Sequence, residues 1–491
     1  MKTICFFSRL SLVDLYGSLD VYLRGEYKVV HLAYSCWEES ILKNKYGIKD
    51  VINFKEALQN EWINSPPTPD LLKEIDDLFI NHTNNRFSLS SAINMDRTFR
   101  HMSYSDCLML ASNYYHFWKN FISNNNIDAF IHEPVAVFMT HVLSCLCRKA
   151  DVYFLTQSQV HGCFEHNWIF CEGVENIPIE WPIPASNFNS KVIFNPNAKA
   201  FLGGFRTDYA ALVSSLNRDI KRMNRSYVSF FIWVCLKSFK TLISSFSGLF
   251  LIRKYNLIDH HDWYMTGTAT PFFLEIYNRW FQTFKLNYDE YDESDKFYFY
   301  PMHAEPEAAV LYRGDGIYEG QIKLIENISE QLPPNVILYV KDHPHRSSFK
   351  SMVDVDRLRS IPNIKFIDPL VSGKLLIAKS IGVITISGSS GFEAILLKKP
   401  VYLFGHRFYS LSKQVYSIRN IRDLRKILYD TRNIVYSDKD VLSFVEDYLN
   451  IVHEGFVLYF PSSLSKISIN HRDNAITVSL GLLKGLKSIF K

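Results

Sequence analysis

Long uninterrupted apolar runs are missing from this sequence, which excludes an obvious membrane-spanning helix. The longest apolar stretch, residues 227–252, contains Lys237 and Lys240. Each lysine would cost about 2.5–3.5 kcal/mol at the centre of a bilayer. The first residues also lack the apolar length and the small-residue cleavage site of a signal peptide, and they are typical of a buried strand. We therefore expect a cytoplasmic protein.

Strong charge and metal-binding cysteine patterns are also missing. The formal net charge is only +4, and no basic run accompanies a nucleic-acid-binding motif, so we expect no nucleic acid partner. The eight cysteines lie between Cys5 and Cys235 and form no C-x-x-C pair, which favours reduced thiols over a disulfide framework or a zinc site. The mild positive balance is compatible with anionic ligands such as sugar nucleotides, or with an anionic membrane face.

The C-terminal half has a regular alternation of short apolar runs and helix-like segments. The expected strands are 296–301, 336–341, 363–367, 381–387 and 400–404. The helix-like segments between them include 318–331, 370–379 and 391–397. Strands that are apolar throughout and alternate with helices are typical of a parallel sheet covered on both faces. This half is therefore predicted to be a Rossmann-like domain.

The N-terminal half repeats this pattern less regularly. The expected strands are 4–7, 27–32, 129–131 and 152–155, and a helix at 136–150 joins the last two. Two such domains indicate an α/β fold with two Rossmann-like domains facing across a cleft, the GT-B type, with ligands at the carboxyl ends of the strands. The expected parts are an N-terminal domain, a helical connecting region, a C-terminal domain and a tail helix, at 1–200, 201–295, 296–455 and 456–491.

Polar residues follow three of the expected C-terminal strands. In the first segment, 300–307, His303 and Glu305 could orient a ligand or transfer a proton, and the alternative is a turn with solvated charges. In the second, 339–346, the strand ends in Lys341, His343 and Arg346. Such groups can stabilise the negative charge that develops on a departing phosphate. The alternative there is an ordinary surface loop.

The third segment, 385–394, is a strand that enters a loop rich in glycine and serine and then a helix. Main-chain N–H groups at a helix start, together with serine hydroxyls, can bind an anion. The residues concerned are Ser387, Gly388, Ser389 and Ser390, and Glu393 would follow in the first turn, within reach of a ribose hydroxyl. A plain capped helix start is the alternative. The loop lacks the lysine of a P-loop and the G-x-G-x-x-G spacing, so neither an NTPase nor a dinucleotide enzyme is indicated.

Taken together, YPMHAEPEAAVLY, YVKDHPHR and ITISGSSGFEAILLKKPVYLFG resemble the capsular polysaccharide biosynthesis family, whose members include Kdo transferases. The resemblance covers about 296–406 and implies a GT-B fold, a CMP-activated sugar donor as substrate, no cofactor and no metal. It places Lys341 and His343 near the donor phosphate, the serines of 387–390 on phosphate or carboxylate oxygens, and Glu393 at the ribose. It also places His303 and Glu305 at the floor of the cleft.

Two N-terminal segments are candidates for the rest of the site. Glu133 follows an expected strand and could act as base, acid or nucleophile. The segment 156–162, TQSQVHG, adds polar groups after the next strand, and its His161 is as readily explained as a structural histidine. The run of residues 259–262, DHHD, resembles metal ligands in composition only, because it has no helical i, i+4 pair and no partner motif.

The leading hypothesis is a metal-independent glycosyltransferase. Its donor domain would be the C-terminal one and its acceptor domain the N-terminal one, with a lipid-linked glycan of bacterial capsule or lipopolysaccharide as acceptor and Kdo from CMP-Kdo as the implied sugar. The alternatives are a non-catalytic polysaccharide-binding or assembly scaffold and a nucleotide-sugar epimerase. The tail at 475–491 is apolar with three lysines, so it either packs on the fold or touches the inner membrane surface.

Overall fold

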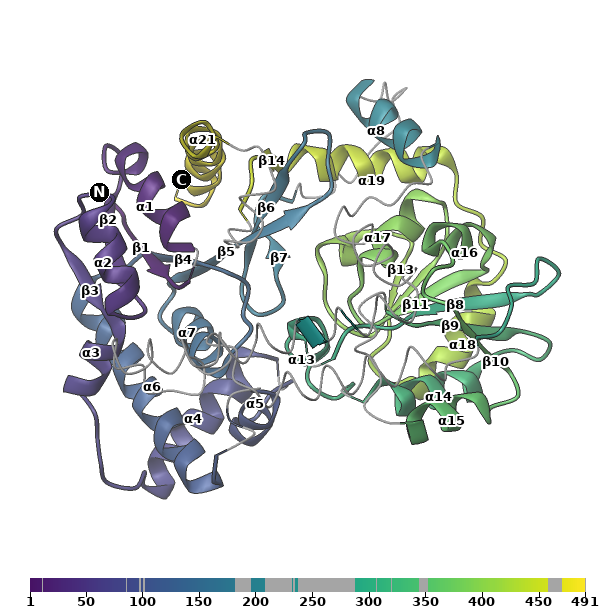
Figure 1. Ribbon diagram of the computed structural model, residues 1–491, viewed down its shortest axis with the longest axis horizontal. Coiled ribbons are helices and arrows are strands. Elements are labelled where there is room, and N and C mark those ends of the chain that lie inside the picture. Colours follow the sequence, from purple (N-terminus) through teal and green to yellow (C-terminus); the bar gives the residue numbers. More distant parts are fainter. Residues whose placement is uncertain are drawn as a thin grey trace. The chain divides into compact units, whose positions relative to one another are not determined.

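The protein folds into two compact units, each built around its own sheet (Figure 1). The computed structural model describes residues 1–10, 12–84, 86–96, 99, 102–181, 196–207, 232, 235–236, 288–305, 307–318, 320–343, 352–457 and 470–490. Unit 1 comprises residues 1–193 and 446–491, and unit 2 comprises residues 194–445. The predicted α/β class with two Rossmann-like domains is thereby confirmed.

Unit 1 contains an eight-stranded sheet in the order β14-β6-β5-β4-β1-β2-β3, with β7 paired to β6. Its strands are β1 (Thr3–Ser8), β2 (Lys28–Ala33), β3 (Val51–Asn53), β4 (Ala129–His132), β5 (Tyr153–Val160), β6 (Asn167–Glu172), β7 (Ile177–Pro178) and β14 (Val452–Glu454). In this sheet β5, β4, β1, β2 and β3 are parallel to one another. Strand β6 runs antiparallel to each of its neighbours, β5, β7 and β14. The four strands expected from the sequence all lie in the parallel part.

Most helices of unit 1 begin at a residue whose side chain caps them, although the helix that follows Val137 has no side-chain cap. Their bounds are α1 (Leu12–Leu23), α2 (Cys36–Asn44), α3 (Phe54–Asn60), α4 (Pro69–His82), α5 (Leu89–Met95), α6 (Tyr104–Asn125), α7 (Phe138–Lys149) and α21 (His471–Ile489). Ser35 and Glu38 form a capping box at α2, and Ser103 Oγ accepts from the Asp106 main chain at 3.2 Å at α6. The predicted βαβ unit is β4-α7-β5.

The C-terminal helix α21 packs on unit 1 beside α1 (Figure 1). Leu482 and Leu486 are fully buried in the cluster that also holds Trp168 and Phe170. Gly481 lets the helix approach closely, because a Cβ there would lie 2.7 Å from a ring carbon of Trp168. Of the two interpretations of the tail, packing on the fold is therefore the one that the structure supports.

Unit 2 contains a six-stranded sheet in the order β10-β9-β8-β11-β12-β13, with every pair parallel. Its strands are β8 (Phe297–Pro301), β9 (Ile337–Lys341), β10 (Ile364–Ile367), β11 (Gly382–Thr385), β12 (Val401–Leu403) and β13 (Val415–Ser417). Each of the five C-terminal strands expected from the sequence is present. The strands are buried along most of their length, as the apolar runs predict.

The helices between these parallel strands are α13 (Ala308–Leu311), α14 (Gln321–Gln331), α15 (Met352–Arg359), α16 (Gly373–Lys379) and α17 (Ser389–Leu396), with a 3₁₀ turn η2 at Phe408–Leu411. In the chain, α8 (Pro196–Thr207) precedes these strands, and α18 (Ile421–Thr431) and the longer α19 (Asp438–Asn450) follow them. Among the helices of the described residues, we find none that combines the length and the apolar character needed to span a bilayer. Most of the 227–252 stretch lies outside the described residues.

Candidate functional site

Three strand ends meet at one edge of the unit 2 sheet. Strand β8 lies between β9 and β11, and all three are parallel, so their carboxyl ends are neighbours. The residues predicted from the sequence come directly at these ends: Lys341 closes β9, His303 and Glu305 follow β8, and the loop 387–390 follows β11. The topology therefore brings the three sequence motifs to one edge, where ligands bind in open parallel sheets.

His303 is buried at the base of this edge. Its Nε2 lies 3.2 Å from Thr385 Oγ1, and its main-chain N–H donates to Gln321 Oε1 at 2.8 Å. Burial, together with the guanidinium groups of Arg407 and Arg313, lowers the pKa of His303 to about 4. The imidazole is therefore neutral at neutral pH, when it can exchange a proton but adds no positive charge.

Glu305 is held at the start of α14. Its Oε1 accepts from the Gln321 main-chain N–H at 3.1 Å and from Gln321 Nε2 at 2.8 Å, and its Oε2 accepts from Gly320 N–H at 3.3 Å. A carboxylate at a helix N-terminus satisfies main-chain donors and interacts favourably with the helix dipole. These contacts explain Glu305 as a structural carboxylate, and its catalytic role stays a prediction.

Lys341 and Glu393 affect each other's protonation. Burial lowers the pKa of Lys341 to about 8, although the carboxylates of Asp342, Asp368 and Glu393 oppose the change. Burial likewise raises the pKa of Glu393 to about 7, and the lysines at 341 and 374 oppose that change. Since each residue contributes to the shift of the other, the ends of β9 and of the β11–α17 segment converge, and both groups can change charge near neutral pH.

The three serines of the loop 387–390 have different surroundings. Ser387 is buried, and its Oγ donates to the Ala309 carbonyl at 2.8 Å. Ser389 is exposed at the first position of α17. Ser390 Oγ is buried and has no hydrogen-bond partner in the described part of the chain. Anion binding by this loop stays a prediction, for which the fold leaves Ser389, Ser390 and the first main-chain N–H groups of α17, whereas Ser387 holds the loop to α13.

Gly388 is needed at the N-cap of α17 for steric reasons. A Cβ there would lie 2.9 Å from Thr385 Oγ1 and 3.2 Å from His303 Cε1. Its N–H donates to Thr385 Oγ1 at 3.1 Å, and its carbonyl accepts from the Tyr409 hydroxyl. Both main-chain groups are thus fixed, which orients the peptide that opens the helix.

Two arginines of this edge were not predicted from the sequence. Arg313 follows α13 and Arg407 follows β12, and both lie close enough to His303 to lower its pKa. Arg407 Nε is buried without a hydrogen-bond partner among the residues that the structure describes. Arg407 could have been found, because the sequence continues from an expected strand into Gly405 and His406, the same pattern as at the other strand ends. Arg313 carries no comparable signal.

Several predicted residues lie at or beyond the limits of the described chain. His343 is described and follows Lys341 by two positions, so it lies at the same strand end. Arg346 and the run 259–262 lie outside the described residues. Within the described ranges, no group of three or more histidine, cysteine or acidic side chains could hold a metal ion.

Glu133 lies at the carboxyl end of β4 in unit 1. Its Oε1 forms an ion pair with Arg9 Nη1 at 2.9 Å, and its side chain is 34% exposed against 8% for Arg9. The neighbouring His132 is buried, with Nδ1 2.8 Å from the Phe7 carbonyl, and burial lowers its pKa to about 4. Glu133 is thus a carboxylate anchored through one oxygen and partly open to solvent.

The side chains of the segment 156–162 lie on two faces of the unit 1 sheet and differ in their partners. Thr156 Oγ1 and Ser158 Oγ both donate to Asn176 Oδ1, at 2.7 and 3.0 Å, which explains them as structural. The carbonyl of His161 accepts from the Tyr448 hydroxyl. Gln157 alternates with its neighbours along β5 and therefore lies on the opposite face.

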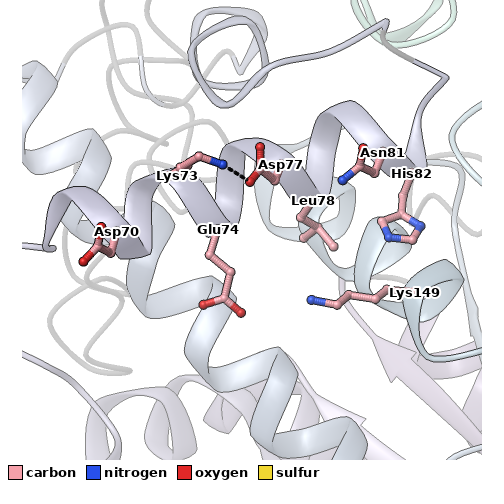
Figure 2. A pocket seen from close by; sticks show the side chains of 8 residues that line it. All are labelled: Asp70, Lys73, Glu74, Asp77, Leu78, Asn81, His82 and Lys149. Carbon is pink, nitrogen blue, oxygen red and sulfur yellow. Dashed lines mark hydrogen bonds and ion pairs between the residues drawn. The ribbon is translucent and has the colours of Figure 1, made fainter.

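A surface depression of about 430 Å³ lies along α4 (Figure 2). Lys73 and Asp77 pair along one face of α4 at 2.5 Å, and Glu74 points toward the side where Lys149 lies. Glu74 also accepts from Tyr115 and Lys119 of α6. The depression is lined by charges of both signs, of which Lys73 and Asp77 pair with each other. None of its residues was predicted as a site residue, so we assign it no role in the candidate site.

The fold defines an α/β protein of two Rossmann-like domains, and the unit 2 sheet brings Lys341, Arg407 and the start of α17 to one strand edge. The family model described as "Capsule polysaccharide biosynthesis protein" matches residues 243–416. This match includes all three motifs on which the predicted resemblance depends, and it confirms that resemblance. No curated protein matches the sequence.

Solved structures of two kinds are similar to the chain. UDP-GlcNAc 2-epimerase from Methanocaldococcus jannaschii is 12% identical, with 92% of this chain and 99% of that chain covered and a TM-score of 0.26. The Neisseria meningitidis UDP-GlcNAc 2-epimerase is 13% identical, with 99% and 100% covered and a TM-score of 0.25. The β-Kdo 2,7 transferase KpsC from Thermosulfurimonas dismutans is 14% identical, with 75% and 89% covered and a TM-score of 0.30.

Proposed function

We propose that this chain is a glycosyltransferase that moves a nucleotide-activated sugar onto a bacterial capsule or lipopolysaccharide glycan. The observation that carries this proposal is the gathering of cationic groups and the α17 N-terminus at the carboxyl edge of the unit 2 sheet. A nucleotide sugar carries its negative charge on the phosphate, which these groups suit. The match to the capsule polysaccharide biosynthesis family supports the biological setting.

The donor site in this proposal is made of residues from four strand ends. Lys341, Arg407 and the first turn of α17 bind the phosphate, with His343 and Arg346 as further donors. Glu393 accepts a hydrogen bond from a ribose hydroxyl, and His303 supports the 387–390 loop through Thr385. The family resemblance adds a CMP-linked donor, with Kdo as the sugar. The positive charge that the departing phosphate needs comes from the protein, so the proposal requires no metal ion.

The transfer itself is a substitution at the anomeric carbon of the donor. An acceptor hydroxyl oxygen forms the new bond to that carbon, and the bond from the carbon to the phosphate oxygen breaks with its electron pair leaving on the nucleotide. The proton of the acceptor hydroxyl passes to a carboxylate, for which Glu133 is our candidate because it is partly exposed and anchored through one oxygen.

Isothermal titration calorimetry with CMP, with UDP as comparison, tests the donor site. The Lys341→Met variant should bind CMP at least tenfold more weakly than the wild type, because it loses a buried cation at the phosphate. The Lys323→Met variant is the matched control: Lys323 lies on α14 of the same unit, is exposed and pairs only with Glu326 among the described ion pairs, so its CMP affinity should be unchanged.

Product analysis by mass spectrometry then separates the three functions. A glycosyltransferase consumes the CMP-sugar and extends a glycolipid acceptor. An epimerase would convert a UDP-sugar to an isomer without any acceptor. A wild-type chain that binds neither CMP nor UDP would contradict the proposal and leave the scaffold as the explanation.

A further inference from the structure

Several buried side chains of unit 1 have polar atoms with no hydrogen-bond partner among the described residues. Three of these side chains come from elements around Glu133, and their unpartnered atoms are Ser8 Oγ, Tyr16 Oη and both amide atoms of Gln157. Ser8 and Tyr16 are 0% exposed, and Gln157 is 6% exposed. Buried polar groups without partners are rare in native proteins, and several of them close together require an explanation.

Strand register places two of these side chains on either side of Glu133. Strands β1 and β5 both pair with β4 in parallel, and continuing their registers past the last paired residues sets Ser8 and Gln157 opposite Glu133. Neighbouring strands are about 4.8 Å apart, so the row of three spans roughly 10 Å. Gln157 also pairs with Phe170 of the core cluster beneath α21, which fixes the face on which it lies.

Tyr16 reaches the same row from α1. Its ring stacks on Phe6 of β1, with the two ring centroids 4.6 Å apart. Phe6 precedes Ser8 by two positions and therefore shares its face. Burial raises the pKa of the Tyr16 hydroxyl, and the charge of Glu133 adds to the effect, which places the hydroxyl near that carboxylate. Unpaired groups thus adjoin Glu133 on both flanking strands and on the covering helix.

The chemistry of this row selects an uncharged, hydroxyl-rich ligand. Two hydroxyls and a carboxamide can each donate and accept, while Glu133 accepts only. The carboxylate charge is already balanced by Arg9, so an anionic ligand would gain nothing here. The hydroxyls of a neutral sugar each donate and accept, as this row requires. Glu133, whose side chain is 34% exposed, links the row to solvent.

We propose that Ser8, Tyr16, Glu133 and Gln157 form a saccharide-binding subsite for the hydroxyl groups of a neutral sugar in the acceptor glycan. The identification of this sugar as part of the acceptor rests on the proposed function. The binding of a neutral saccharide does not depend on transfer. Arg9 is a positioning residue, because it fixes one oxygen of Glu133 and leaves the other for the ligand.

Saturation-transfer difference NMR on the full chain, without donor, tests the subsite. The probes are lactose, maltose and N,N′-diacetylchitobiose. We expect signals from at least one probe with the wild type, and a loss of at least fivefold in Tyr16→Phe and in Gln157→Leu. Neither variant should lower the unfolding midpoint, since the atoms removed have no protein partner. Tyr22→Phe, on the same helix α1, is the matched control and should behave as the wild type.

Steady-state kinetics adds a second readout. In both variants the KM for the acceptor should rise at least tenfold while the KM for the donor stays within twofold. The subsite is disproved if no probe binds the wild type, if binding persists in both variants, or if both variants lower the unfolding midpoint without affecting binding. Failure of the wild type to transfer sugar would instead disprove the proposed function and leave the NMR result to decide the subsite.

Discussion

The carboxyl edges of the two sheets differ in which polar side chains have partners within the fold. In unit 2, the carboxylate of Glu305 and the hydroxyl of Ser387 are engaged within the fold, whereas Arg407 Nε and Ser390 Oγ have no hydrogen-bond partner among the described residues. In unit 1, the only cation described at the row, Arg9, is engaged with Glu133, and neutral groups are left. Under our two proposals, the same strand-edge architecture therefore binds an anion in one unit and a polyol in the other.

The largest effect is expected from breaking the covering of the unit 1 sheet. Leu482→Ala on α21 should lower the free energy of unfolding of unit 1 by about 2–5 kcal/mol, because it opens a cavity in a fully buried cluster. Urea unfolding followed by tryptophan fluorescence measures the change. CMP affinity in unit 2 should stay within about twofold if the two edges are independent.

A control on the same helix separates packing from charge. Lys487 pairs with Glu26 at 2.8 Å, but both side chains are exposed. Lys487→Gln should therefore change the free energy of unfolding by less than about 1 kcal/mol. Equal losses in the two variants would contradict the burial of α21 described above.

A pH titration sharpens the comparison at the level of ligand binding. CMP affinity should fall by about tenfold, or about 1.4 kcal/mol, between pH 6 and pH 9. The sign follows from the two pKa values: Glu393 gains negative charge as pH rises through about 7, and Lys341 loses positive charge as pH rises through about 8, and both changes disfavour an anion. Calorimetry at several pH values measures this.

Two further titrations decide the origin of that dependence. Glu393→Gln should remove the step near pH 7 and move the Lys341 step below pH 8, because the Glu393 carboxylate opposes the lowering of the Lys341 pKa. Saccharide binding in unit 1 should be flat over the same range, because the neighbouring His132 has a pKa of about 4. A CMP affinity independent of pH would show that neither residue faces the phosphate.

The smallest effect is expected at the hydroxyl that orients the α17 loop. Tyr409→Phe removes the hydrogen bond to the Gly388 carbonyl, which is worth about 1 kcal/mol, and should weaken CMP binding by about fivefold. Tyr416→Phe is the control, since its hydroxyl bonds Tyr436 at 2.6 Å, away from the loop. If both variants bind CMP equally well, the orientation of Gly388 is not limiting.

Many residues of the unit 2 edge could be predicted from the sequence, because the patterns that place them at strand ends are local. An apolar run followed by Lys341, or by Gly388 and its serines, places side chains at a strand end without knowledge of the tertiary structure. What the sequence could not tell is which of them the fold itself uses. Ser387 and Glu305 look like ligand groups until their partners Ala309 and Gln321 are seen.

The unit 1 edge was harder to predict because its residues come from distant segments. Glu133 was singled out, but Ser8, Tyr16 and Gln157 belong to β1, α1 and β5 and carry no motif. Only the strand order β5-β4-β1 makes them neighbours. Their unpaired state is a property of packing, which periodicity and composition do not reveal.

The antiparallel pairing of β14 with β6 has a consequence for biosynthesis. Residues 452–454 join a sheet whose other strands all end by residue 178, and α21 then covers its face. A ribosome releases these segments only after all of unit 2 has emerged. Unit 2 can therefore fold during translation before the sheet of unit 1 is complete, and Trp168 is covered only once residues 471–489 have followed.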